Sequence, residues 1–172
     1  MEMLLRKISL EEFKRRAGII KLLILDVDGV MTDGRIIYTS EGSEIKNFDV
    51  KDGHGIVLAR DSGIEIAIIS GRESAVTRRR AEDLEIKFVY QGVKEKEKIV
   101  NRLLDKLDID FDQVAFLGDD VIDIAVMNVV GIGAAVADAH PKALEMACWI
   151  TKKNGGRGAV RELIDAILEA QA

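Results

Sequence analysis

The chain has 172 residues and a formal net charge of −5 at pH 7, an acidic balance that excludes nucleic acid as the main partner. Its length predicts one domain over residues 1–172, since a chain of this size buries well over half of its unfolded surface. Cys148 is the only cysteine, so an internal disulfide is impossible, and no apolar run approaches the ~18 residues of a membrane span. We therefore expect a cytoplasmic protein without a membrane partner, whose ligands are small solutes and metal ions.

The first predicted elements are a short helix, a buried strand and a hairpin. Ser9 and Glu12 have the spacing of a capping box, so a helix is expected through about Arg16. The apolar run 22–25 predicts a strand that is buried on both faces, as in a parallel sheet. Polar and glycine residues between two further apolar runs indicate a β-hairpin over about 34–49.

From residue 52 onward, strands and helices alternate regularly. The expected strands lie at 65–69, 87–90, 114–117, 132–136 and 149–150, and the expected helices at 52–61, 73–84, 95–107, 122–129, from 141 onward and at 158–170. Alternation of this kind predicts an α/β fold with right-handed crossovers between parallel strands. We expect a Rossmann-like three-layer fold with a parallel central sheet, the β-hairpin as an insertion and no separate cap domain.

Polar residues follow several of the predicted strands at the point where each strand ends. Asp26 and Asp28 close the first strand, and because side chains alternate along a strand, both are expected on the same side. Ser70, Lys96 and Asp119 follow later strands. The carboxyl ends of parallel strands lie on one edge of a sheet, so these side chains are expected to converge. Carboxylate oxygens hold Mg²⁺, and a hydroxyl and an ammonium bind the non-bridging phosphate oxygens, so these groups are the parts of a site for phosphoryl transfer.

Four short motifs resemble those of the haloacid dehalogenase superfamily of phosphatases, in their usual order. They are Asp26-Val27-Asp28-Gly29-Val30, Ser70 in Ile69-Ser70-Gly71-Arg72, Lys96 after Gln91-Gly92, and Gly118-Asp119-Asp120-Val121-Ile122-Asp123. The resemblance implies that Asp26 is the nucleophile and Asp28 the general acid/base. It also implies that Ser70 and Lys96 hold the phosphate. The implied ligands of Mg²⁺ are Asp26, Asp28 through its backbone carbonyl, and Asp119.

A finer resemblance covers nearly the whole chain. The stretches 49–53, 136–141 and 154–162 look like those of the 3-deoxy-D-manno-octulosonate 8-phosphate phosphatases, which are magnesium-dependent homotetramers in bacterial lipopolysaccharide synthesis. This resemblance implies a small sugar-phosphate substrate. The substrate contacts it implies are Asp49, Val50, Lys51, Asp52, Gly53, Arg72, Arg80 and Lys96. Val57 stands where many relatives have an arginine, so one contact to the substrate carboxylate is missing or replaced.

The predicted insertion is too small to be a lid domain, although an acyl-phosphate site benefits from shielding against water. A neighbouring subunit can supply that cover, and the exposed edges of hairpins favour pairing. We therefore expect the hairpins to join at the centre of a homotetramer. The glycine-rich C-terminal tail, about 154–172, is expected to carry Arg157 to an adjacent active site.

Several alternatives stay open. The substrate is 3-deoxy-D-manno-octulosonate 8-phosphate or the phosphate of another sugar acid, a nine-carbon one of the sialic acid type. A phospho-acceptor signalling domain also has an acidic pair, a hydroxyl and a lysine on such an edge, and an inactive scaffold is a third interpretation. Ser70 is either a phosphate ligand or a helix cap. Asp120 and Asp123 either support the metal site or are N-terminal helix acids. Lys96 is preferred to Lys94 on motif spacing.

Overall fold

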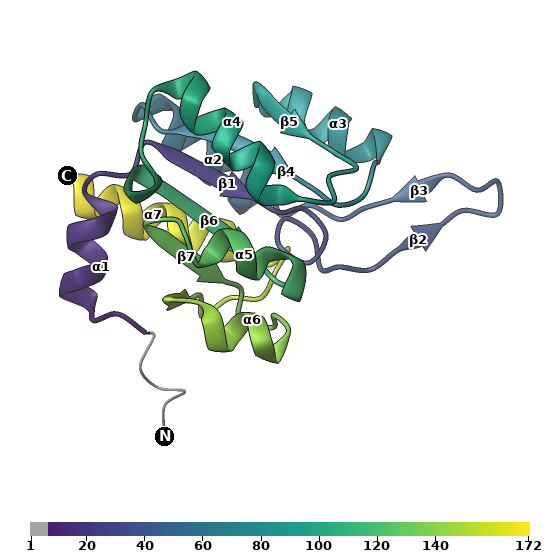
Figure 1. Cartoon of the computed structure of the whole chain (residues 1–172). Coiled ribbons are helices and arrows are strands. Elements are labelled where there is room, and N and C mark those ends of the chain that lie inside the picture. Colours follow the sequence, from purple (N-terminus) through teal and green to yellow (C-terminus); the bar gives the residue numbers. More distant parts are fainter. Residues whose placement is uncertain (1–6) are drawn as a thin grey trace.

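Six parallel strands form the central sheet of the computed structural model, which describes residues 7–172 (Figure 1). They are β1 (Leu22–Leu25), β4 (Glu65–Ile69), β5 (Phe88–Tyr90), β6 (Val114–Gly118), β7 (Ile132–Ala135) and β8 (Trp149–Ile150). Their order across the sheet is β5-β4-β1-β6-β7-β8, and each neighbouring pair is parallel. The predicted α/β fold with a parallel sheet is confirmed. The predicted domain over 1–172 includes residues 1–6, which lie outside the described part of the chain.

β1 lies in the middle of the sheet because its sequence is apolar on both faces. Its four residues, Leu-Leu-Ile-Leu, are all buried, as expected for a strand that helices cover from both sides. Leu25 is in register with Ile68 of β4 and Leu117 of β6. The three strands therefore end together, and the residues that follow them reach the same edge of the sheet.

Helices cover both faces of the sheet (Figure 1). One face carries α1 (Leu10–Ala17), α2 (Val50–Asp61), α3 (Ala75–Asp83) and α7 (Ala159–Gln171), and the other carries α4 (Lys96–Leu107), α5 (Ile124–Met127) and α6 (Pro141–Met146). The handedness of the crossovers decides which face each connecting helix covers. The chain first moves across the sheet from β1 through β4 to β5 and then in the opposite direction from β6 through β7 to β8. Right-handed connections in opposite directions place their helices on opposite faces. Among residues 7–172, no helix is long and apolar enough to cross a membrane.

An antiparallel hairpin projects from the body of the molecule between β1 and β4 (Figure 1). Its strands are β2 (Ile37–Tyr38) and β3 (Glu44–Ile45), with Ile37 opposite Ile45. The side chains of Tyr38 and Ile45 are exposed. The insertion between β1 and β4, all of which the structure describes, consists of this hairpin and α2, so it contains no separate cap domain.

α2 begins at Val50, two residues before the expected start at residue 52. The cause is Asp49, whose carboxylate accepts a hydrogen bond from the Lys51 backbone N–H (2.6 Å) and caps the helix. The segment 49–53 is therefore the first turn of a helix rather than a loop.

The predicted helix 122–129 is wrong at both ends. The chain first forms a 3₁₀ turn, η3 (Val121–Asp123), and only Ile124–Met127 is α-helical. Asp120 and Asp123 close a capping box around η3, which tightens this turn. A second 3₁₀ turn, η2 (Phe111–Gln113), precedes β6.

Asp52 joins α2 to α7. The residue is 2% exposed, and its carboxylate accepts hydrogen bonds from the backbone N–H groups of Gly158 (3.3 Å) and Arg161 (2.8 Å). Burial raises the pKa of Asp52 to about 6, although these N–H donors oppose the shift. Gly55 lets α7 pack closely against α2, because a Cβ at that position would lie 2.8 Å from the Arg161 Cδ. Asp52 is therefore the cap of a helix that is distant in sequence.

We expect Asp52→Ala to lower the free energy of unfolding by about 1–3 kcal/mol, since buried N–H groups lose their acceptor. Urea unfolding at neutral pH measures the change. Asp61→Ala is the matched control, because Asp61 is an exposed residue at the other end of α2. Its cost should stay within about 0.5 kcal/mol. Equal losses in the two variants would contradict the role assigned to Asp52.

Candidate active site

Three carboxylates meet at the carboxyl edge of the sheet. Asp26 follows β1, Asp119 follows β6 and Asp123 ends η3, and each offers an oxygen within 4.8 Å of the others. Carboxylate oxygens are the ligands that Mg²⁺ prefers in proteins. The structure thus brings Asp26 and Asp119 together, as the parallel sheet led us to expect, and adds Asp123.

Lys96, the first residue of α4, binds two members of this acidic cluster. It is 2% exposed, and its Nζ donates hydrogen bonds to Asp26 (2.8 Å) and Asp123 (2.7 Å). Burial opposes the charge of Lys96, but the two carboxylates outweigh burial and raise the pKa of its ammonium. Lys94, the alternative considered from the sequence, is exposed. Lys96 therefore contributes a fixed positive charge to the site.

Asp123 is held through both of its carboxylate oxygens. One oxygen accepts the hydrogen bond from Lys96, and the other accepts the backbone N–H groups of Asp119 (2.9 Å) and Asp120 (3.2 Å). Gly118 leaves the necessary room, since a Cβ there would lie 2.5 Å from this carboxylate. Asp123 therefore orients the loop after β6, whereas Asp120 is exposed and caps η3.

The acidic cluster carries more negative charge than Lys96 offsets. Burial, followed by the charge of Asp26, raises the pKa of Asp119 to about 8, and burial raises that of Asp26 to about 6 despite the nearby ammonium. Gly29, with φ +92°, lets the loop after β1 lie close to Asp119, because a Cβ at this position would collide with the Asp119 carboxylate. The charge and the donor set of the site fit a divalent cation.

Ser70 and Arg72 follow β4 at the same edge of the sheet. Ser70 is 3% exposed, and its Oγ accepts a hydrogen bond from the Arg72 backbone N–H (3.3 Å). Ser74, not Ser70, is the N-cap of α3. Ser70 is therefore not a helix cap. Its hydroxyl accepts one hydrogen bond and can donate its proton to another acceptor, such as a phosphate oxygen.

The carboxylate of Asp28 does not join the acidic cluster, contrary to the expectation that it shares a side with Asp26. β1 ends at Leu25, and the chain then turns, with the Met31 N–H donating to the Val27 carbonyl oxygen (2.9 Å). Strand alternation therefore no longer applies at Asp28. The resemblance had assigned only its backbone carbonyl to the metal, and that assignment stays a prediction.

Two hairpin residues that sequence reasoning missed, Glu44 and Lys46, complete the surroundings of Asp28. Lys46 forms an ion pair with Asp28, and Arg72 lies 3.4 Å from the same carboxylate. Glu44 binds Arg72 (2.7 Å) and accepts a hydrogen bond from the Ser74 hydroxyl (2.5 Å), and these two contacts lower its pKa. Lys46 lies one residue beyond β3 (Glu44–Ile45), so strand alternation gave no signal that both side chains would meet at Asp28 and Arg72.

The predicted substrate segment 49–53 divides into exposed and buried residues. Val50 and Lys51 are exposed and remain open to a ligand. Asp49 caps its own helix, and Asp52 is enclosed against α7. The contact of Asp52 with a substrate stays a prediction, and in this structure its buried carboxylate is bound to two backbone N–H groups.

Arg80 lies against the same helix. Its guanidinium carbon lies 5.6 Å from the centroid of the Phe48 ring, and its Nη2 occupies the space that a Cβ at Gly53 would need. Among the described residues, the buried Arg80 Nε has no hydrogen-bond partner, which suits it to binding an anion. Val57 is half-buried against the core and offers no group to a carboxylate.

The glycine-rich segment 154–158 packs on the loop after β1. The Gly156 N–H donates to the Val30 carbonyl oxygen (2.8 Å). A Cβ at residue 155 would collide with Gly29, and one at Gly156 with Thr32. The segment therefore supports the backbone that carries the first motif.

Arg157 lines a surface groove of about 560 Å³ together with Lys51 and residues of α7. No member of the acidic cluster lines this groove. Within one chain, Arg157 and the acidic cluster thus belong to different surfaces, and the contact of Arg157 with an adjacent active site stays a prediction.

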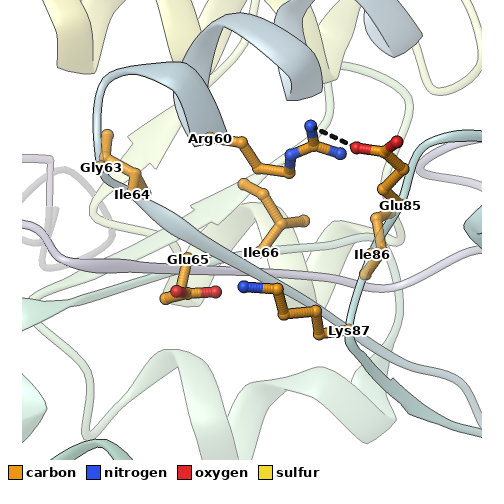
Figure 2. A pocket seen from close by; sticks show the side chains of 8 residues that line it. All are labelled: Arg60, Gly63, Ile64, Glu65, Ile66, Glu85, Ile86 and Lys87. Atoms are coloured by element: carbon orange, nitrogen blue, oxygen red, sulfur yellow. Dashed lines mark ion pairs between the residues drawn. The ribbon is translucent and has the colours of Figure 1, made fainter.

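A separate cavity of about 250 Å³ lies near the amino ends of the strands (Figure 2). Its lining residues are Arg60, Gly63, Ile64, Glu65, Ile66, Glu85, Ile86 and Lys87. Arg60 comes from the end of α2, and the others precede or begin β4 or precede β5, whereas the acidic cluster follows the carboxyl ends of the strands. An ion pair between Arg60 and Glu85 (2.9 Å) lies in this cavity, which contains none of the predicted site residues.

Comparisons with known proteins agree with this geometry. A family profile described as haloacid dehalogenase-like hydrolase matches residues 89–164. The chain is 49% identical to the 3-deoxy-D-manno-octulosonate 8-phosphate phosphatase KdsC of Yersinia pestis over 157 residues, which cover 91% of this chain and 84% of that protein. KdsC of Escherichia coli K12 is 49% identical over 156 residues, 91% of this chain and 83% of that protein.

A solved structure extends the likeness to the fold. The crystal structure of the phosphatase of the same name from Moraxella catarrhalis, in complex with magnesium ion, phosphate ion and KDO, matches with a TM-score of 0.92 at 42% identity. The match covers 95% of this chain and 94% of that one. The chain therefore belongs to the haloacid dehalogenase-like hydrolases, in the branch of the 3-deoxy-D-manno-octulosonate 8-phosphate phosphatases, and is a phosphoric monoester hydrolase.

Proposed function

We propose that this enzyme hydrolyses 3-deoxy-D-manno-octulosonate 8-phosphate to 3-deoxy-D-manno-octulosonate and phosphate with the help of Mg²⁺. The observation that carries the proposal is the gathering of Asp26, Lys96 and Asp119 at one edge of a fold shared with a phosphatase that binds magnesium, phosphate and KDO. The identity of 49% to KdsC supports the same substrate. In this proposal the reaction takes place in the cytoplasm and serves lipopolysaccharide synthesis.

In the proposed reaction, an oxygen of Asp26 attacks phosphorus, the bond from phosphorus to the sugar oxygen breaks, and an aspartyl phosphate forms. Asp28 gives a proton to the leaving sugar oxygen. It then takes a proton from the water that releases phosphate and restores Asp26. The Ser70 hydroxyl and the Lys96 ammonium bind the non-bridging phosphate oxygens. The hydrogen bond from Lys96 to Asp26 (2.8 Å) keeps the nucleophile oriented.

Asp26 and Asp119 are the carboxylates that would hold Mg²⁺, together with the backbone carbonyl of Asp28, and oxygens of Asp26, Asp119 and Asp123 lie within 4.8 Å of one another. When bound, the ion neutralises charge on the phosphate oxygens. Asp123 differs from the other two, since Lys96 and two backbone N–H groups already fix its carboxylate. We assign it the task of orienting Asp119 toward the ion.

Arg72 and Arg80 are the proposed partners of the charged groups of the substrate. The Arg72 side chain is 36% exposed beside Asp28, and the buried Arg80 Nε has no hydrogen-bond partner among residues 7–172. A nine-carbon sugar acid phosphate is the second candidate substrate. Val57 is apolar where the family resemblance implies an arginine, and this difference favours the second candidate.

We also propose a homotetramer that assembles through the hairpins. Ile36, Tyr38 and Ile45 expose 54%, 63% and 44% of their surface on an element that projects from the body of the molecule. Apolar side chains gathered on a projecting element favour burial against a second copy. The adjacent subunit would then cover the site, with Arg157 of its tail as the contact.

A panel of sugar-acid phosphates tests the substrate. We expect magnesium-dependent phosphate release from 3-deoxy-D-manno-octulosonate 8-phosphate with a kcat/KM at least about tenfold above that for nine-carbon sugar acid phosphates. Asp26→Asn should abolish turnover, because an amide does not attack phosphorus, while its circular dichroism stays that of the wild type. Asp120→Asn, at an exposed acid beside the cluster, is the control and should stay active. Wild-type turnover by Asp26→Asn would refute the proposed chemistry.

Removal of Mg²⁺ should make the stability of the protein depend on pH. In the metal-free chain, burial raises the pKa values of Asp26 and Asp119 from 3.8 to about 6 and about 8. Above pH 3.8 and up to these values, the folded state binds protons that the unfolded state does not. The metal-free melting temperature should therefore fall as pH rises from about 5 to about 8. Scanning fluorimetry with a chelator measures this trend.

Added Mg²⁺ should raise the melting temperature more at about pH 8 than at about pH 6, because protons compete with the ion for Asp119. Asp119→Asn should lose most of this stabilisation, and Asp120→Asn should retain it. A Mg²⁺ effect that is independent of pH would argue against the acidic cluster as the metal site.

Ile45→Lys should dissociate the proposed tetramer, because it places a charge among the exposed apolar residues of the hairpin. Light scattering measures the mass, and we expect activity to fall as the subunits separate. Glu41→Lys, in the exposed turn of the same hairpin, is the control. A monomeric wild type with full activity would rule out the assembly.

A further inference from the structure

Four charged side chains form a closed ring of alternating charge between the hairpin and the active site. Lys46 pairs with Asp28, and Asp28 lies 3.4 Å from Arg72. Arg72 lies 2.7 Å from Glu44, which lies 3.7 Å from Lys46 and closes the ring. Glu44 and Lys46 come from the hairpin, whereas Asp28 and Arg72 come from the loops after β1 and β4. The ring therefore connects an insertion without catalytic motifs to the proposed general acid.

Lys46 is the most enclosed member of the ring. Its side chain is 1% exposed, compared with 20% for Asp28 and 36% for Arg72. A buried ammonium is costly unless it is paired, so the location of Lys46 depends on its carboxylate partners. Arg72 is open to solvent and is also assigned to the substrate. When Arg72 turns to the substrate, Lys46 is the cation that stays with Asp28.

Neighbouring residues of the hairpin have separate tasks. Glu44 in β3 and Lys46 just after the strand both contact residues at the active site, whereas Ile45 between them is 44% exposed. Lys46 can therefore act on the site of its own chain while Ile45 contacts another subunit.

We propose that Lys46 is a positioning residue: it binds one oxygen of the Asp28 carboxyl group, so that the other oxygen, protonated, faces the leaving oxygen and gives it the proton. The inference rests on the proposed function. Lys46 binds one oxygen of Asp28 and Arg72 faces the other, so rotation of the carboxylate is restricted at both ends. Glu44 contacts both cations and fixes their separation.

The leaving group of the substrate provides the test. Phenyl phosphate and p-nitrophenyl phosphate have similar size and no sugar contacts, but phenolate needs protonation far more than nitrophenolate does. The ratio kcat/KM covers the steps up to departure of the leaving group, so hydrolysis of the aspartyl phosphate does not enter. We expect Lys46→Met to lower kcat/KM for phenyl phosphate about tenfold more than for p-nitrophenyl phosphate. Asp28→Asn should show the same selective loss.

Two further variants complete the design. Lys46→Arg keeps the positive charge and should restore most of the selectivity between the two esters, and Glu41→Gln, in the exposed turn of the same hairpin, should leave it unchanged. If Lys46→Met does not fold, Lys46→Gln takes its place and must show the same selective loss. An equal loss on both esters, or no loss, overturns the role of Lys46. Absence of wild-type turnover on every phosphate ester overturns the proposed function instead.

Discussion

The contact of Lys96 with Asp26 and Asp123 is the interaction on which the rest of the site depends. Parallel strands that end in register deliver acids to one edge, where they repel each other in a buried setting. The single ammonium of Lys96 offsets part of that repulsion and fixes two of the three carboxylates. The remaining charge is what makes the edge suited to a divalent cation and to an anionic substrate. Fold stability and ligand preference thus have a common electrostatic origin.

The glycines of the site serve this electrostatic arrangement by letting backbone and carboxylate approach each other. Gly29 and Gly118 stand where a Cβ would meet the acids of the β6 loop. The hairpin adds further charged side chains around Asp28, which the strands of the parallel sheet do not supply. An insertion too small to form a lid therefore still takes part in the site through Glu44 and Lys46.

The fold was predictable because its cause is local. The fully apolar run of β1 and the regular alternation of later strands and helices need no knowledge of distant contacts, and the same regularity places Asp26, Ser70 and Asp119 at one edge. What escaped prediction depends on partners far away in the sequence. Asp28 looked like a companion of Asp26 because its turn was not visible in the pattern. The role of Asp52 as a cap of α7 could not be read from the pattern, because its partner, the first turn of α7, lies more than a hundred residues later.

The close packing of residues 155 and 156 on the loop after β1 has a consequence for how this enzyme can vary. Two positions near the C-terminus are restricted to glycine by the backbone of the first motif, although neither takes part in chemistry. Replacing the segment that contains residues 155 and 156, by engineering or in evolution, therefore also changes the backbone next to the nucleophile. Changes in this segment are constrained by catalysis.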